Sequence, residues 1–168
     1  VGTSTPATVY STTTDSGAGT WNIVLPDGHG VDATTPFVVY VDGDAVIKAT
    51  TVTKASSTSN NISNIDLYQD TVIVKHEATE GKSPSISDAE MAIYDSTDDD
   101  DIRYTASSTL NTLDLLLSTT TQELHVWTGD TFTTYGEVTL YTSTSTDSSL
   151  HIDNSAELNL TATSSVHG

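Results

Sequence analysis

The chain has 168 residues and a formal net charge of −18, from 23 Asp and Glu against 5 Lys and Arg. Five scattered cations cannot build the basic patch that a nucleic-acid interface needs, and a sequence without cysteine has no disulfide framework, thiolate nucleophile or zinc–thiolate site. No apolar run approaches the roughly 20 residues that span a bilayer, so we expect neither nucleic-acid binding nor membrane insertion.

The acidic composition has a specific character. Asp outnumbers Glu by 17 to 6, Lys occurs four times, and Thr and Ser together contribute 53 residues. A net charge this far from zero opposes compaction at low ionic strength, whereas molar salt shortens the Debye length to about 3 Å. Surfaces rich in Asp and poor in Lys resemble those of proteins from extreme halophiles. An ordinary acidic extracellular protein is the alternative.

The first half of the chain predicts short strands separated by turns. Runs dense in β-branched and aromatic residues occur at 21–25, 36–41, 44–54 and 67–76. Asp42-Gly43 stands between two of these runs and predicts a hairpin, because Asp-Gly favours the tight turns that join antiparallel strands. Residues 77–87 carry Gly81 and Pro84 and predict a loop or linker.

The second half shows the same pattern of strands and turns. Thr128-Gly129-Asp130 predicts a second hairpin. Residues 90–94 favour a strand, and a short capped helix that starts near Ser87 is the alternative. We expect eight strands here, at 91–94, 102–106, 110–117, 123–127, 131–135, 138–142, 150–152 and 158–163.

Short strands that are separated by closely spaced turn signals are typical of sandwiches and barrels. We therefore predict an all-β fold of two small antiparallel sandwich- or barrel-like modules, residues 1–83 and 84–168. Residues 34–56 aligned with 120–142 match at six of 23 positions, including Gly-Asp in each predicted turn. This match suggests an internal repeat, and chance similarity between two Thr-rich hairpins is the alternative.

One acidic cluster stands out in the predicted loops. Carboxylate oxygens suit hard cations such as Ca²⁺, so Asp98, Asp99, Asp100 and Asp101 are weak candidates for loose cation binding. Four consecutive carboxylates cannot all point at one ion, and the cluster lacks the glycine and glutamate of an EF-hand. A solvated acidic loop is the alternative, and we predict no defined metal site.

The histidines and serines give no catalytic pattern. No two of the five histidines have metal-ligand spacing on one predicted element, and His76, His125 and His151 are interpreted as packed or surface residues of strands. The sequence contains neither HExxH nor the Gly-x-Ser-x-Gly turn that presents a nucleophilic serine. We therefore predict no catalytic residue, no cofactor and no enzymatic activity.

Three segments of the first half resemble small β-modules in virion surface proteins of tailed viruses. They are Trp21 to Pro26, then Thr35 to Gly43 with its Tyr-Val-Asp-Gly turn, and Asp70 to His76, which begins Asp-Thr-Val-Ile-Val. The resemblance is confined to the first half of the chain and departs from the viral pattern after Gly43. It implies a structural or host-contacting role and brings no catalytic residues.

We therefore expect a non-enzymatic structural protein of a virion surface, a capsid decoration or an appendage, that acts by multivalent contact. Its expected partners are other virion or surface-layer proteins and copies of itself, with contacts near 34–41 and 123–127. The predicted interaction residues are Trp21, Phe37, Tyr40 and Trp127. An extracellular glycan-binding or adhesin module of a cell surface is the alternative, and exposed aromatic side chains would distinguish it.

Overall fold

The computed structural model describes residues 10–25, 36–44, 46–54, 61–75, 86–87, 90–91, 101–105, 107–109, 111–118, 121–134, 136–140, 147–161 and 164–167. These residues contain strands and no α-helix, which confirms the predicted all-β class. Within the same residues there is no helix of the length and apolarity that crossing a membrane requires.

Twelve strands occur in the described residues. They are β1 (Pro36–Tyr40), β2 (Thr50–Lys54), β3 (Thr71–Val74), β4 (Ile86–Ser87), β5 (Ile102–Thr105), β6 (Thr112–Leu115), β7 (Thr121–Val126), β8 (Thr131–Thr134), β9 (Glu137–Thr139), β10 (Asp147–Ile152), β11 (Glu157–Leu160) and β12 (Ser165–His167). Three sheets contain them, in the orders β1-β2-β3-β7-β10, β11-β8-β4 and β12-β9-β6-β5. We call these the first, second and third sheets.

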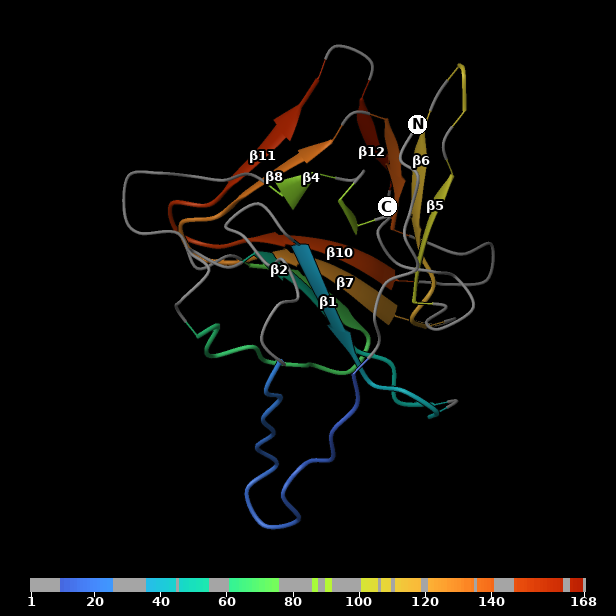
Figure 1. Cartoon of the computed structure of the whole chain (residues 1–168). Helices are drawn as coiled ribbons and strands as arrows, with labels where there is room; N and C mark the ends of the chain where they lie inside the picture. The colour runs from blue at the N-terminus through green and yellow to red at the C-terminus, as the bar shows by residue number, and fades with distance from the viewer. Residues whose placement is uncertain are drawn as a thin grey trace.

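The chain visits the three sheets in turn. It runs through β7, β8 and β9 and then through β10, β11 and β12, and each later strand lies parallel beside its counterpart of the previous turn (Figure 1). Strands β3, β4 and β6 form the turn before, with β5 added as an antiparallel neighbour of β6. Stacked coils of this kind form a β-solenoid, in which each coil contacts mainly its neighbours.

Strand direction therefore differs from the prediction. Of the nine strand pairs in the described residues, seven are parallel and only β1–β2 and β5–β6 are antiparallel. Parallel neighbours need a long connection that leaves the sheet and returns to it. Here the strands of the other two sheets supply that connection. The sequence did not indicate the strand direction, because apolar and polar residues alternate in the same way in parallel and antiparallel strands.

The first sheet and the core extend across the predicted module boundary at 83/84. Strand β3 pairs with β7 from Thr71–Glu123 to Val74–Val126. One apolar cluster joins both halves of the chain: Val52, Val72, Val74, Ile86, Met91, Ile102, Leu113, Leu115, Leu117, Leu124, Val126, Phe132, Val138 and Leu140. The division of the sequence at 83/84 thus coincides with no division of this sheet or of the core.

The two predicted hairpin turns have different outcomes. The first is confirmed in part: β1 and β2 pair antiparallel and Gly43 between them has φ +76°, but β1 ends at Tyr40 and the predicted strand 44–54 begins only at Thr50, so a longer loop replaces the tight turn. The second is wrong: Gly129 has φ +78°, but the chain passes from β7 in the first sheet to β8 in the second. A left-handed glycine can serve a hairpin or a corner between sheets, so the tripeptide did not distinguish them.

The repeat of the structure is shorter than the one that the sequence suggested. Residues 34–56 contain a hairpin whereas 120–142 contain a solenoid coil, so the alignment of these windows has no structural counterpart. The structural repeat instead pairs Asp147 with Thr121 and Glu157 with Thr131, an offset of 26 positions for both β7–β10 and β8–β11. Gly129 and Ser155 occupy the same corner of successive coils, and both have positive φ, at +78° and +62°.

Glu90 and Met91 form a turn and not the start of the predicted strand. Ser87 and Glu90 bond reciprocally: the backbone N–H of Ser87 donates to Glu90 Oε2 over 2.9 Å, and that of Glu90 donates to Ser87 Oγ over 3.3 Å. This is the hydrogen-bond pattern of a capping box, and it is followed by Met91, which is fully buried. Residues 92–94 of that predicted strand lie outside the described residues.

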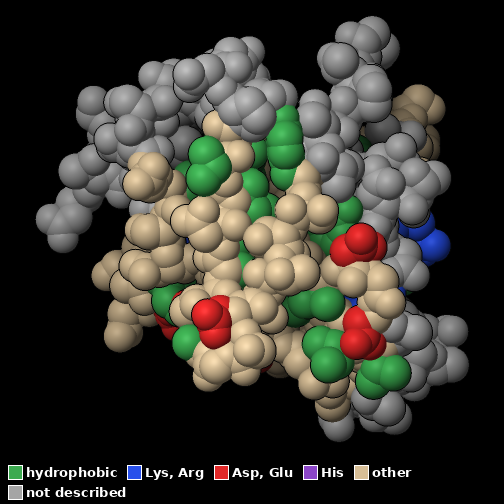
Figure 2. Space-filling model, turned by 60° about the horizontal axis from the view of Figure 1, so that its bottom comes forward, with side chains coloured by type: hydrophobic (Ala, Val, Ile, Leu, Met, Phe, Trp, Pro, Cys, Tyr) green, Lys and Arg blue, Asp and Glu red, His purple; other side chains and the backbone are tan. Residues whose placement is uncertain are grey.

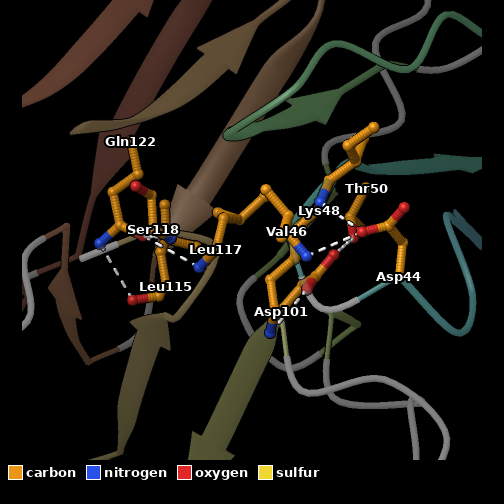
Figure 3. A network of polar contacts seen from close by, with 10 residues as sticks. Asp44, Val46, Lys48, Thr50, Asp101, Leu115, Leu117, Ser118 and Gln122 are labelled. Carbon is orange, nitrogen blue, oxygen red and sulfur yellow. Dashed lines mark hydrogen bonds and ion pairs between the residues drawn. The ribbon is translucent and has the colours of Figure 1, made fainter. Parts of the chain in front are cut away.

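A buried amide ties the first sheet to the corner that precedes it. Gln122, only 3% exposed, donates from Nε2 to the carbonyls of Leu115 and Leu140, over 3.1 and 2.7 Å (Figure 3). Its Oε1 accepts from the backbone N–H groups of Leu117 and Ser118, over 3.1 and 3.4 Å. One side chain thus satisfies four backbone groups, which would otherwise be costly to bury at this corner.

The outer surface is mostly uncharged and polar on the face seen from below. Figure 2 shows that neither apolar nor acidic side chains form a continuous patch on the described part of this face, and that Lys and Arg reach it at one margin.

Across the outer side of β2 and β3, residues 61–70 are anchored by hydrogen bonds from Thr51 Oγ1 to the Asp66 carbonyl and from Lys75 Nζ to the carbonyls of Ser63 and Asn64.

Candidate metal centre

Two histidines lie side by side on the outer face of the first sheet. Leu124 and Val126 of β7 are fully buried in the core, so His125 between them projects to the opposite face. The parallel register places His125 beside Ile73 of β3 on one side and His151 of β10 on the other. The solenoid repeat therefore stacks two imidazoles that belong to equivalent positions of successive coils.

The rings are stacked at close range. Their centroids are 4.4 Å apart and their planes differ by 12°. The side chain of His125 is 12% exposed and that of His151 is 54% exposed. Trp127 covers His125 from the end of β7, with ring centroids 5.3 Å apart. The pair is consequently held on one side and open to solvent on the other.

A carboxylate stands on each side of the two rings. Glu123 Oε1 lies 3.9 Å from Nδ1 of His125 and 3.8 Å from Nδ1 of His151. Asp153 faces the other nitrogens, with Oδ2 3.3 Å from Nε2 of His125 and Oδ1 3.2 Å from Nε2 of His151. The two acids thus contact different nitrogens of the same two rings.

Hydroxyl groups orient both acids. Ser149 Oγ donates to Glu123 Oε2 over 3.0 Å, and Thr128 Oγ1 donates to Asp153 Oδ2 over 3.0 Å. Desolvation raises the pKa of the Asp153 carboxyl, but the hydrogen bond from Thr128 and the close approach of the two histidines outweigh it, so the pKa lies below its ordinary value. The Asp153 carboxylate is therefore stabilised as the anion that faces the rings.

This arrangement can hold a cation through nitrogen and oxygen ligands together. Glu123, His125 and His151 each offer one ligand atom, and these atoms lie within 4.8 Å of one another. The Nε2 atom of His125 is buried and has no well-aligned hydrogen-bond partner, although Asp153 Oδ2 is close to it.

Sequence reasoning missed this cluster because it searched for ligands within single predicted elements. The two histidines come from different strands and meet only through parallel stacking. The recoverable signal is the recurrence of Leu-His-Val at 124–126 as Leu-His-Ile at 150–152. The interpretation of His125 and His151 as packed or surface residues of strands is right for each residue taken singly, but it did not include their pairing. His76 lies outside the described residues.

The structure describes one of the four residues predicted for loose cation binding. Asp98, Asp99 and Asp100 lie outside the described residues. Asp101 is 2% exposed, and its carboxylate accepts a hydrogen bond from Thr50 Oγ1 over 2.8 Å and lies 3.3 Å from Lys48 Nζ (Figure 3). This carboxylate is therefore engaged by protein groups rather than presented to solvent.

The four predicted interaction residues come from separate segments of the chain. Trp21 precedes the sheets, Phe37 and Tyr40 belong to β1, and Trp127 follows β7; all four are half-buried. Strands β2 and β3 separate β1 from β7 in the first sheet. Of the two predicted contact segments, 34–41 contains the edge strand β1, whereas 123–127 overlaps β7, which is paired on both sides.

Comparisons with known proteins add no relative: no family model, curated protein or solved structure matches the chain.

Proposed function

We propose that this chain is a non-enzymatic structural protein of a virion surface that acts by repeated contact with copies of itself and with neighbouring surface proteins. The observation that carries the proposal is the edge of the coil formed by β10, β11 and β12, which no described strand covers. In the described residues each of these strands pairs on one side only. We call this surface the C-terminal coil edge.

The C-terminal coil edge exposes apolar side chains at positions that the previous coil buries. Ile152 is 41% exposed, whereas Val126 beside it in β7 is fully buried. Leu160 is 54% exposed, whereas Thr134 beside it in β8 is fully buried. Unpaired strand edges with apolar residues template pairing with another chain, so a second copy of this solenoid is the occupant that we propose.

Charge sets the conditions for this contact. A chain with a net charge of −18 repels its own copies at low ionic strength, and salt screens that repulsion. Self-association through the C-terminal coil edge should therefore be weak in dilute buffer and strong in concentrated salt. If the protein is adapted to brine, its melting temperature should also rise with salt concentration.

The placement on a virion is supported by the resemblance of residues 21–26, 35–43 and 70–76 to viral surface modules. The alternative of a glycan-binding module would favour a groove with an exposed aromatic side chain, on which a sugar ring could stack. The structure has a shallow polar groove where β3, β7 and β10 begin, lined by Gln69, Asp70, Thr71, Thr121, Gln122, Glu123, Ser148 and Ser149. No aromatic residue lines this groove, so the groove itself offers a sugar ring no stacking surface.

Sedimentation velocity between about 0.1 and 2 M KCl tests the proposal. We expect a monomer at low salt and oligomers at high salt, with a melting temperature that rises over the same series. Leu160→Asp should abolish the oligomers, and Val46→Asp is the matched control, because Val46 is 74% exposed in the loop between β1 and β2, away from the coil edge.

Binding to purified virus particles of a halophilic host tests the placement separately, by co-sedimentation of the labelled chain. A chain that stays monomeric at every salt concentration and fails to bind particles would contradict the proposed function. Binding to immobilised glycans without self-association would favour the adhesin alternative instead.

A further inference from the structure

We propose that Glu123, His125 and His151 bind one divalent transition-metal ion of the Zn²⁺ type, and that this ion clips the coil β7–β8–β9 to the coil β10–β11–β12. Two of the three ligands belong to β7 and the third to β10. An ion held by all three would therefore join adjacent coils on the outer face of the first sheet, in addition to the backbone hydrogen bonds between β7 and β10.

The chemistry of the donors selects the ion. Two imidazole nitrogens and one carboxylate oxygen, with a water as fourth ligand, form a ligand set that Zn²⁺ accepts in proteins. Hard cations such as Ca²⁺ and Mg²⁺ prefer sites made of oxygen atoms alone. The proposal therefore predicts discrimination between Zn²⁺ and Ca²⁺, which general attraction to an acidic surface would not produce.

The geometry is close to that of a bound site. Ligand atoms that share a tetrahedral Zn²⁺ at about 2.0 Å lie about 3.3 Å apart, and Glu123 Oε1 is 3.9 and 3.8 Å from the two Nδ1 atoms. Because the rings are nearly parallel, at 12°, they must tilt for both Nδ1 atoms to converge on one ion. The more exposed ring, His151, has the room to make that movement.

Asp153 acts as the positioning residue. It contacts Nε2 of both rings, at 3.3 and 3.2 Å, and so favours the tautomer that carries a proton on Nε2. The Nδ1 lone pairs are then directed to the side of Glu123. A carboxylate behind a metal-binding imidazole is the usual outer partner of such ligands, and its loss typically lowers metal affinity ten- to hundredfold.

Isothermal titration of the full chain, stripped with EDTA, with ZnCl₂ in a salt buffer tests the proposal. We expect saturation at a single Zn²⁺ per chain, no matching response to CaCl₂, and a rise in melting temperature with Zn²⁺. His151→Ala should weaken Zn²⁺ binding at least tenfold and remove the rise. His167→Ala is the matched control, because His167 is an exposed histidine of the same coil that contacts Ser165 instead of the cluster.

Two further variants keep the test decisive. If His151→Ala does not fold by circular dichroism, Glu123→Gln removes one ligand and keeps the shape of the side chain. Asp153→Asn should lower the affinity ten- to hundredfold, and long-range ¹H–¹⁵N spectra should show that the ion-free rings lose their preference for the Nε2–H tautomer. A merely structural role for Asp153 would leave that tautomer signal unchanged.

Three results would overturn the inference. The first is the absence of saturable Zn²⁺ binding to the wild-type chain. The second is equal Zn²⁺ affinity in wild type, His151→Ala and Glu123→Gln. The third is equal competition by Ca²⁺, which would show that the ion is attracted by the acidic surface as a whole.

Discussion

The two ends of the solenoid are built by different rules. Around β1 and β2 the chain forms an antiparallel hairpin, in which Tyr40 pairs with Thr50 across a loop that contains Gly43. From β7 to β12 the chain forms two coils in parallel register, in which matching strand positions of β7 and β10, and of β8 and β11, share one constant offset in sequence. A hairpin joins residues that are near in sequence, whereas the coils align residues that are distant in sequence, such as His125 and His151.

This difference explains why the chemically suggestive cluster lies in the coils. Parallel stacking puts each residue of β10 directly beside its equivalent in β7, so a histidine that recurs once per coil becomes a stacked pair. In the antiparallel β1–β2 pair the register runs in reverse, so Phe37 faces Thr53 and Val39 faces Thr51. Recurrence in sequence creates contact only where the strands are parallel.

The largest expected effect is a loss of stability, and it should differ between equivalent core positions of the two coils. Leu124 in β7 is fully buried, whereas Leu150 beside it in β10 is only partly buried, because no described coil covers it. We expect Leu124→Ala to cost about 2–5 kcal/mol of unfolding free energy and Leu150→Ala clearly less than half of that. Urea denaturation of both variants in the same salt measures the difference.

A pair of equal losses would contradict the comparison. It would mean that the coil β10–β11–β12 is as well covered as the coil before it. Because solenoids can lose terminal coils before the rest unfolds, amide exchange should be followed in parallel. We expect β10 to exchange faster than β7 in the wild-type chain and in Leu150→Ala.

A smaller effect on stability is expected when the corner residues of the two coils are exchanged. Gly129 and Ser155 both have left-handed φ, and a Cβ at Gly129 would meet no atom within 4 Å. Gly129→Ser should therefore cost only the backbone penalty, about 1–2 kcal/mol. Ser155→Gly should relieve that penalty but add unfolded-state entropy of about 0.5–1 kcal/mol, for a small net gain. Thermal melts should show a lower melting temperature for Gly129→Ser and a slightly higher one for Ser155→Gly. A lower melting temperature in both variants would show that contacts of the Ser155 side chain stabilise this corner.

Sequence reasoning succeeded where the signal was local. The all-β class follows from runs such as 36–41 and 71–74, which are rich in β-branched residues. The antiparallel pairing of β1 and β2 on either side of Asp42-Gly43 follows from the turn signal, although the connecting loop is longer than a tight turn. It failed where the fold depends on stacking at a distance. Thr128-Gly129-Asp130 carries the same turn signal as the hairpin, and only the neighbouring coil decides that the chain turns a corner there.

The candidate metal centre was out of reach for the same reason. Glu123 and His125 share one strand, but the third ligand, His151, comes from the next coil. Its approach depends on the register between β7 and β10, which no spacing rule within one element contains. The Leu-His-aliphatic recurrence at 124–126 and 150–152 would have indicated it only to a search for short parallel repeats.

The smallest expected effect lies in the loop of the hairpin and needs no neighbouring coil. Asp44 Oδ1 accepts hydrogen bonds from the backbone N–H groups of Val46 and Ile47, over 2.8 and 2.9 Å. The bond from Ile47, followed by that from Val46, holds the pKa of this fully exposed carboxyl below its ordinary value. Because the folded-state pKa is the lower one, the stabilisation is complete above the unfolded-state pKa of about 3.9 and is lost as pH falls through the folded-state value.

We expect the amide resonances of Val46 and Ile47 to shift together with the Asp44 carboxyl in an NMR titration, with a midpoint below that of an unstructured aspartate. In Asp44→Asn the two amides should keep a hydrogen-bond acceptor but lose this acidic transition. Amides that still titrate in the variant would assign the transition to another carboxyl and would remove Asp44 as the local determinant of this loop.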